Sequence, residues 1–104
     1  MRRTLFYSWQ NDLPSNSNLN LIEYCIKNAI KQSQQIKPIP LNIALDKATR
    51  DIPGTPDITD SIFSKINKCN AFVADISIIN SDSKNKKTPN PNVLLELGYA
   101  ASVL

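Results

Sequence analysis

The chain of 104 residues has no histidine, only two cysteines and only two glycines. Without histidine, the common zinc sites, Ser-His and Cys-His nucleophile systems and a histidine general base are excluded, and no metal site is expected. Cys25 and Cys69 do not form a Cys-x-x-Cys motif, and we expect both to be buried free thiols. The glycine-rich phosphate fingerprints of Rossmann and P-loop proteins are absent. Catalysis would therefore have to use carboxylates, backbone dipoles, hydroxyls, or Arg and Lys side chains.

Long apolar runs and the apolar core of a signal peptide are also missing, so we expect a cytoplasmic protein without a membrane partner. The net charge of +3 and the hydrophobic fraction of 41% are typical of a globular domain. The basic residues are scattered, except for Lys84, Lys86 and Lys87 in one polar stretch. We interpret this stretch as a solvated loop and do not expect a nucleic-acid partner. Contact with phosphate or nucleic acid is the alternative.

The hydrophobic pattern predicts three strands that alternate with three helices. The strands are expected at residues 4–9, 41–45 and 71–76. The first helix is expected at about 19–34, and the second begins at about residue 56. The third helix begins at Pro91, and Asn90 can cap it. This order predicts an α/β fold with a parallel sheet between two helical layers. Because three strands make a thin sheet, we expect residues 1–104 to form one domain that is incomplete at its C-terminus. A monodisperse monomer with cooperative melting would contradict this expectation.

Glu96 stands out in the last predicted helix, because the residues around it are apolar. At helical spacing it shares a face with Tyr99, Ala100 and Val103. A carboxylate on such a face is either desolvated or lines a cleft. The only other glutamate, Glu23, has polar neighbours. Glu96 is therefore the leading candidate for a functional residue.

Ligands of open parallel sheets bind outside the carboxyl ends of the strands, near the point where the strand order reverses. If the first strand is central, three segments converge there: residues 8–10 with Asp12, residues 46–54, and Asp75 with the loop that leads to Glu96. Asp75 either caps the following loop or contacts a ligand sugar, and capping is the favoured interpretation.

Other residues near this edge also have two interpretations. Trp9 either stacks on a planar ligand ring or belongs to the core. Asp46 and Arg50 either contribute to the site or pair with each other on the surface. Gly98 lies inside a helix, which suggests close packing or the approach of a ligand.

Three segments, 6–12, 45–58 and 90–100, together resemble a bacterial TIR-like domain, and more narrowly the nucleotide-binding TIR-like proteins of bacterial immune systems. The last segment, Asn-Pro-Asn-Val-Leu-Leu-Glu-Leu-Gly-Tyr-Ala, is the most specific part of the resemblance. The resemblance implies a flavodoxin-like fold with five parallel strands, of which this chain would supply the first three. It would thus be truncated after the third strand and its helix.

The resemblance also implies an NAD⁺ glycohydrolase of antiphage defence that is active on self-association through TIR–TIR contacts. NAD⁺ or a related nucleotide would be the substrate, and no separate cofactor is expected. Glu96 corresponds to the catalytic glutamate, Ser8 and Trp9 to the nicotinamide-ribose pocket, and residues 50–57 to a loop that borders the site and mediates assembly. The Trp-x-x-x-Glu pattern of many TIR helices is replaced by Asn92-x-x-x-Glu96, which affects the choice of substrate more than the role of the carboxylate.

This reaction suits a chain without histidine. Nicotinamide leaves NAD⁺ as a neutral molecule, so one carboxylate that stabilises the oxocarbenium ion is sufficient. We expect residues 1–104 alone to be inactive or nearly so. Two alternatives stay open: a nucleoside deoxyribosyltransferase-like N-glycosidase in which Glu96 is the nucleophile, and a non-enzymatic TIR assembly or nucleotide-sensing module in which Glu96 is structural.

Overall fold

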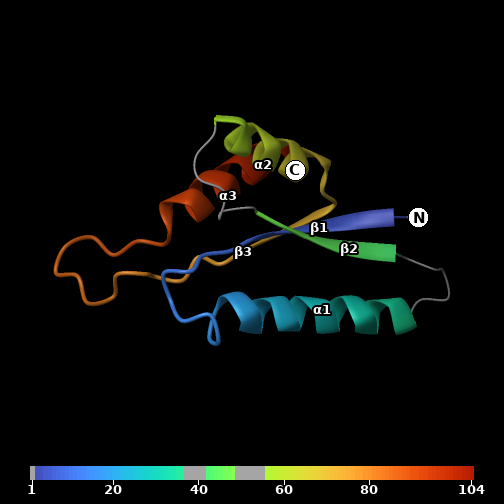
Figure 1. Cartoon of the computed structure of the whole chain (residues 1–104), viewed down its shortest axis with the longest axis horizontal. Helices are drawn as coiled ribbons and strands as arrows, with labels where there is room; N and C mark the ends of the chain where they lie inside the picture. Colours follow the sequence, from blue (N-terminus) through green and yellow to red (C-terminus); the bar gives the residue numbers. More distant parts are fainter. Residues whose placement is uncertain (1, 37–41, 49–55) are drawn as a thin grey trace.

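The chain forms three layers, with a parallel sheet between two helical layers, in a computed structural model that describes residues 2–36, 42–48 and 56–104. In chain order the elements are β1 (Arg2–Ser8), α1 (Leu19–Ile36), β2 (Asn42–Lys47), α2 (Pro56–Lys68), β3 (Ala71–Ala74) and α3 (Pro91–Val103). Helix α1 covers one face of the sheet, and α2 and α3 lie together on the other face (Figure 1). The predicted α/β/α arrangement is confirmed.

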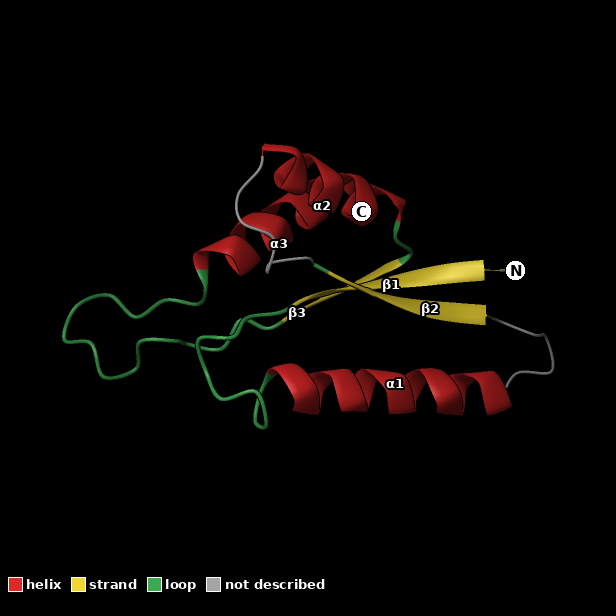
Figure 2. Ribbon diagram, viewed as in Figure 1, coloured by secondary structure: helices red, strands yellow, loops and turns green. Residues whose placement is uncertain are grey.

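β1 is the central strand, because the sheet has the order β2-β1-β3 (Figure 2). Both pairings are parallel, and Leu5 lies opposite Leu45 of β2 and Ala71 of β3. This is the arrangement of the first three strands in a flavodoxin-like sheet, so the predicted fold class is also confirmed. The strand order changes direction next to β1, and open parallel sheets bind ligands at the carboxyl ends of the strands next to such a point.

The three residues that end β1, Phe6, Tyr7 and Ser8, are completely buried. Successive side chains of a strand point to opposite faces, so Phe6 and Ser8 face one helical layer and Tyr7 the other. The ring of Phe6 stacks on Phe72 of β3 with 5.8 Å between ring centroids. The Tyr7 hydroxyl donates a hydrogen bond of 3.3 Å to the carbonyl of Leu19, where α1 begins. The end of β1 is therefore held by both layers.

Helix α3 begins as the sequence predicts. The side chain of Asn90 accepts hydrogen bonds from the backbone N–H groups of Asn92 and Val93, and Pro91 occupies the first turn. The helix packs on α2, where the rings of Phe63 and Tyr99 stack with 4.3 Å between centroids. These contacts set the position of α3 above the carboxyl end of β1.

Strand β3 is shorter than predicted, since it ends at Ala74 rather than at Ile76. The carboxylate of Asp75 accepts a hydrogen bond from the backbone N–H of Ser77, which turns the chain away from the sheet. Strand β2 extends to Lys47 instead of Leu45, and Leu41 lies outside the described residues.

The two cysteines are free thiols, as predicted, but only Cys69 is buried. The expectation for Cys25 was wrong because the stripe of α1 that packs against the core consists of Ile22, Ile26 and Ile30, and Cys25 is exposed. Among the described residues, no helix has both the length and the apolar character needed to cross a membrane.

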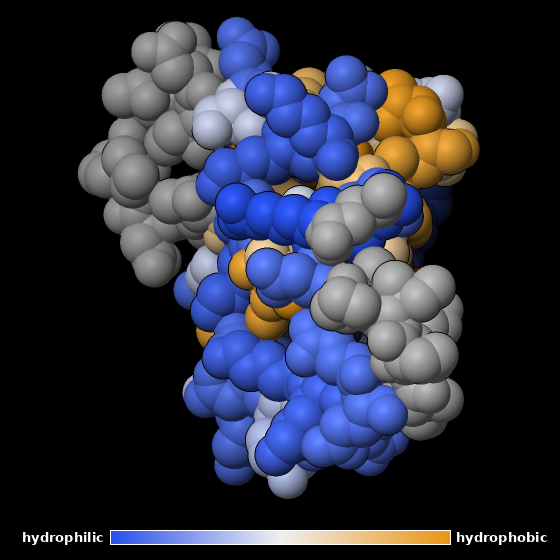
Figure 3. All heavy atoms as spheres, turned by 90° about the vertical axis from the view of Figure 1, so that its right-hand side faces the viewer, coloured by the Kyte–Doolittle hydropathy of each residue, from blue (hydrophilic) through white to orange (hydrophobic). Residues whose placement is uncertain are grey.

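A cavity of about 360 Å³ lies between α1 and the sheet, at the amino ends of the strands. Its walls are mostly apolar and include Ile26, Ile30 and Val73. Figure 3 looks toward this end and shows small groups of hydrophobic atoms between the layers and a larger hydrophobic area on the outer surface at the upper right. The cavity lies at the other end of β1 from Ser8.

Candidate functional site

Ser8 and Glu96 meet at the carboxyl end of the central strand. The Ser8 hydroxyl donates a hydrogen bond of 2.6 Å to Oε1 of Glu96, across 88 positions of sequence. Ser8 is completely buried, and Glu96 is only 4% exposed. A short hydrogen bond to a carboxylate in such surroundings is among the stronger ones in proteins. The structure thus places the leading candidate residue against a second predicted site residue.

The buried side of α3 consists of Val93, Glu96 and Ala100. Of the two alternatives that the sequence left open for Glu96, the structure shows the desolvated carboxylate, and Ala100 shares its face as predicted. Tyr99 is half-buried, but Val103 is 41% exposed and does not share this environment.

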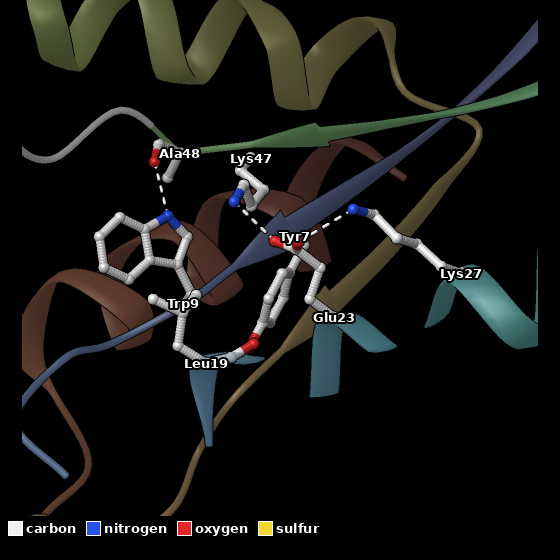
Figure 4. A network of polar contacts seen from close by, with 7 residues as sticks. All are labelled: Tyr7, Trp9, Leu19, Glu23, Lys27, Lys47 and Ala48. Atoms are coloured by element: carbon white, nitrogen blue, oxygen red, sulfur yellow. Dashed lines mark hydrogen bonds and ion pairs between the residues drawn. The ribbon is translucent and has the colours of Figure 1, made fainter. Parts of the chain in front are cut away.

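Trp9 continues the core beyond the end of β1. Its side chain is 7% exposed and belongs to the main hydrophobic cluster. The indole N–H donates a hydrogen bond of 2.6 Å to the carbonyl of Ala48, which follows β2 (Figure 4). Trp9 therefore joins the carboxyl ends of two strands, and its ring packs in the core.

Asp75 is the centre of a buried polar network. Its Oδ2 accepts hydrogen bonds from Gln10 Nε2 at 2.8 Å and from Asn18 Nδ2 at 3.0 Å. Its Oδ1 accepts from the Ser77 hydroxyl at 2.6 Å and from the Ser77 backbone N–H at 3.0 Å. Burial opposes ionisation of Asp75, but the hydrogen bonds from Ser77, Asn18 and Gln10 outweigh it, so the pKa lies below its ordinary value. Asp75 caps its loop, as the favoured interpretation predicts.

The same network joins three chain segments around the site. Oε1 of Gln10 accepts a hydrogen bond from the backbone N–H of Leu13, and the backbone N–H of Asp75 donates to the carbonyl of Ser8. Sequence reasoning named Gln10 only as part of a segment and missed Asn18 and Ser77. The Asp75-x-Ser77 spacing is a readable turn signal, whereas the contacts of Gln10 and Asn18 depend on the sheet.

The other predicted site residues lie farther out. Asp46 pairs with Lys65 of α2 at 3.5 Å, and both side chains are partly exposed. Arg50 lies outside the described residues, as does most of the predicted assembly segment at 50–57. Asn92 is exposed in the first turn of α3, one turn before Glu96. Its backbone N–H donates to Oδ1 of Asn90.

Gly98 has open space around it. A Cβ atom built on this residue would meet nothing within 4 Å, apart from its chain neighbours and the backbone of its own helix. The close-packing interpretation of Gly98 is therefore wrong.

A second polar network lies on the α1 side of the sheet, between α1, β1 and β2 (Figure 4). Oε1 of Glu23 lies 2.6 Å from Nζ of Lys47, and Oε2 lies 3.1 Å from Nζ of Lys27. The contact with Lys47, followed by that with Lys27, lowers the pKa of Glu23. Burial raises the pKa of the Tyr7 hydroxyl, and the carboxylates of Asp75 and Glu23 raise it further. Tyr7 therefore stays protonated and acts as a structural donor.

In the described part of the chain, no group of three or more His, Cys, Asp or Glu side chains is arranged to hold a metal ion. Comparisons with family models, curated proteins and solved structures gave no match. The chemistry open to the site is that of a desolvated carboxylate which a neighbouring hydroxyl holds in place. Such a group can stabilise a positive charge that develops beside it.

Proposed function

We propose that the protein is an N-glycosidase that cleaves the nicotinamide–ribose bond of NAD⁺, with Glu96 as its catalytic carboxylate. The observation that carries this proposal is the buried Ser8–Glu96 contact at the carboxyl end of the central strand. Open parallel sheets bind their ligands at this position. The resemblance of residues 90–100 to the TIR-like helix segment supports the same residue as the catalytic one.

In the proposed reaction, the bond between C1′ of the ribose and the ring nitrogen of nicotinamide breaks. The electron pair goes to that nitrogen, so nicotinamide leaves as a neutral molecule and needs no general acid. The ribose becomes an oxocarbenium ion, which the negative charge of Glu96 stabilises. Water then bonds to C1′ and releases a proton to solvent, which gives ADP-ribose. The low local dielectric strengthens the attraction between carboxylate and cation.

Ser8 is a positioning residue in this proposal. Its hydroxyl binds Oε1 of Glu96 and limits rotation of the carboxylate, which keeps the charge directed at one place. Because Glu96 is 4% exposed, NAD⁺ reaches it only after the side chains over it move. This requirement fits a protein that becomes active when TIR–TIR contacts assemble it.

The test is nicotinamide release by the full-length protein under assembling conditions. Glu96→Gln keeps the shape of the side chain and removes its charge, so we expect release to fall by about 100-fold or more. Glu23→Gln is the matched control, because Glu23 is the only other glutamate and pairs with lysines beneath the site. Release should persist in this control.

The same proteins should also be incubated with deoxynucleosides. Base exchange without loss of NAD⁺ would replace the proposal by a deoxyribosyltransferase-type reaction with Glu96 as nucleophile. If neither substrate is turned over, an assembly or nucleotide-sensing role with a structural Glu96 is favoured.

A further inference from the structure

The segment 77–89, here called the lysine loop, joins β3 to α3 and projects beyond the carboxyl ends of the strands (Figure 1). The loop is closed on itself by hydrogen bonds. The backbone N–H of Ile79 donates to the carbonyl of Thr88 at 3.1 Å, and the backbone N–H of Thr88 donates to Oδ1 of Asn80 at 2.8 Å. Nδ2 of Asn80 donates to the carbonyl of Lys86 at 3.0 Å. Asn80 thus ties the two arms together and gives the loop a defined shape.

Both ends of the lysine loop are attached to the candidate site. At its start, Ser77 binds Asp75. Directly after its end, Nδ2 of Asn90 donates to Oδ2 of Asp12 at 2.6 Å, while Oδ1 of Asn90 caps α3, which carries Glu96 in its second turn. The two ends of the loop therefore lie next to the segments that carry Ser8 and Glu96.

The tip carries a positive charge that is not neutralised nearby. Lys84, Lys86 and Lys87 are all exposed, and Asp82 is the only acidic residue of the loop. Within the described residues, none of these three lysines lies within ion-pair distance of a carboxylate. Of the five other described lysines, Lys27, Lys47 and Lys65 have such partners, whereas Lys31 and Lys68, like the loop lysines, have no carboxylate within ion-pair distance among the described residues.

We propose that the lysine loop binds the pyrophosphate of a dinucleotide whose nicotinamide-ribose end reaches Glu96. This inference rests on the proposed function and assigns the binding of the substrate's diphosphate to the lysine loop. The backbone offers little for an anion here, because the N–H groups of Asn92 and Val93 at the start of α3 already bind Asn90. Charge for the phosphates must therefore come from side chains, and lysine is a suitable point-charge donor.

The test compares two substrates that share the scissile bond. NAD⁺ carries the pyrophosphate, and nicotinamide riboside has no phosphate. In the full-length protein, the substitutions K84Q/K86Q/K87Q should increase KM for NAD⁺ by about tenfold, because three exposed charge contacts with the pyrophosphate are lost. KM for nicotinamide riboside should stay unchanged. The matched control R2Q/K31Q/K68Q removes the same charge from exposed residues toward the amino ends of the strands and should leave both values unchanged.

A binding measurement separates this proposal from the proposed reaction. Titration of the isotopically labelled protein with inorganic pyrophosphate should shift the backbone amide signals of residues 84–87, and the triple lysine variant should lose these shifts. If the wild type released no nicotinamide, the reaction would be refuted, and the titration would still decide whether the loop binds diphosphate.

Three results would overturn the proposal for the loop. One is the absence of pyrophosphate-dependent shifts in the wild type. Another is an equal effect of the triple substitution on NAD⁺ and nicotinamide riboside. The third is lysine-dependent binding of a single-stranded oligonucleotide together with unchanged kinetics for NAD⁺, which would identify a nucleic-acid contact.

Discussion

Asp75→Ala should destabilise the protein by about 4 kcal/mol, because the substitution removes the acceptor of four hydrogen bonds worth about 1 kcal/mol each. The donors come from Gln10, Asn18 and Ser77, and the first two are at least nine-tenths buried. Small domains are stable by only about 5–15 kcal/mol, so this loss is a large fraction of the total. For a chain of this length the melting temperature should fall by roughly 20 °C.

The contribution of Asp75 to the stability of the folded protein also depends on pH. Its pKa in the folded protein lies below the ordinary value of 3.8, because the hydrogen bonds favour the charged form despite burial. A group with a lowered pKa stabilises the fold above its unfolded pKa, and this contribution is lost as the pH falls through the folded pKa. The advantage of the wild type over Asp75→Asn should therefore be complete at pH 7 and shrink below about pH 4.

Urea denaturation followed by circular dichroism measures both effects. Asp82→Ala and Asp82→Asn are the matched controls, because Asp82 is exposed in the lysine loop, and each should change stability by less than about 0.5 kcal/mol. If Asp75→Ala and Asp82→Ala lowered the free energy of unfolding equally, the hydrogen-bond network of Asp75 would not be important for stability. An advantage of the wild type that grows in acid would refute the assigned direction of the pKa shift.

Three further predictions use single residues. Gly98→Ala should raise the free energy of unfolding by about 0.5–1 kcal/mol in urea denaturation, since the added methyl group meets open space, and a loss of stability would contradict this. A thiol reagent should label Cys25 in the native protein and Cys69 only after denaturation, because burial makes Cys69 inaccessible and raises the pKa of its thiol. Fast labelling of both cysteines in the native protein would contradict the structure. Ser8→Ala should lower kcat for nicotinamide release by about tenfold with little change in KM, because Glu96 loses the hydrogen bond that orients it, and an unchanged kcat would exclude a positioning role.

Much of the fold could be predicted because its signals are local. The apolar periodicity that marks α1 and β1 and the Asn90-Pro91 helix start lie within a few residues of one another in sequence. The alternation of strands and helices then restricts the sheet to parallel pairing with right-handed crossovers. The end of β3 was predicted less well, since a side-chain hydrogen bond of Asp75 competes there with strand propensity.

The site was predictable in part. An acidic residue among apolar neighbours indicated that Glu96 is either desolvated or lines a cleft, and the structure shows that it is buried. The rule for parallel sheets indicated which edge it faces. The exposure of Cys25 and the open space at Gly98 were not predictable, because helical periodicity does not say which neighbouring elements reach a given position.

By itself, the sequence determined the order and type of the elements, the cap of α3 and the chemical identity of the leading candidate residue. Only the tertiary structure decided that Ser8 holds Glu96, that Gln10 and Asn18 join Asp75, and that Trp9 packs in the core. The physical reason is distance along the chain. Periodicity and capping act over a few residues, whereas the contact between Ser8 and Glu96 spans 88 positions and forms only when α3 packs over the end of β1.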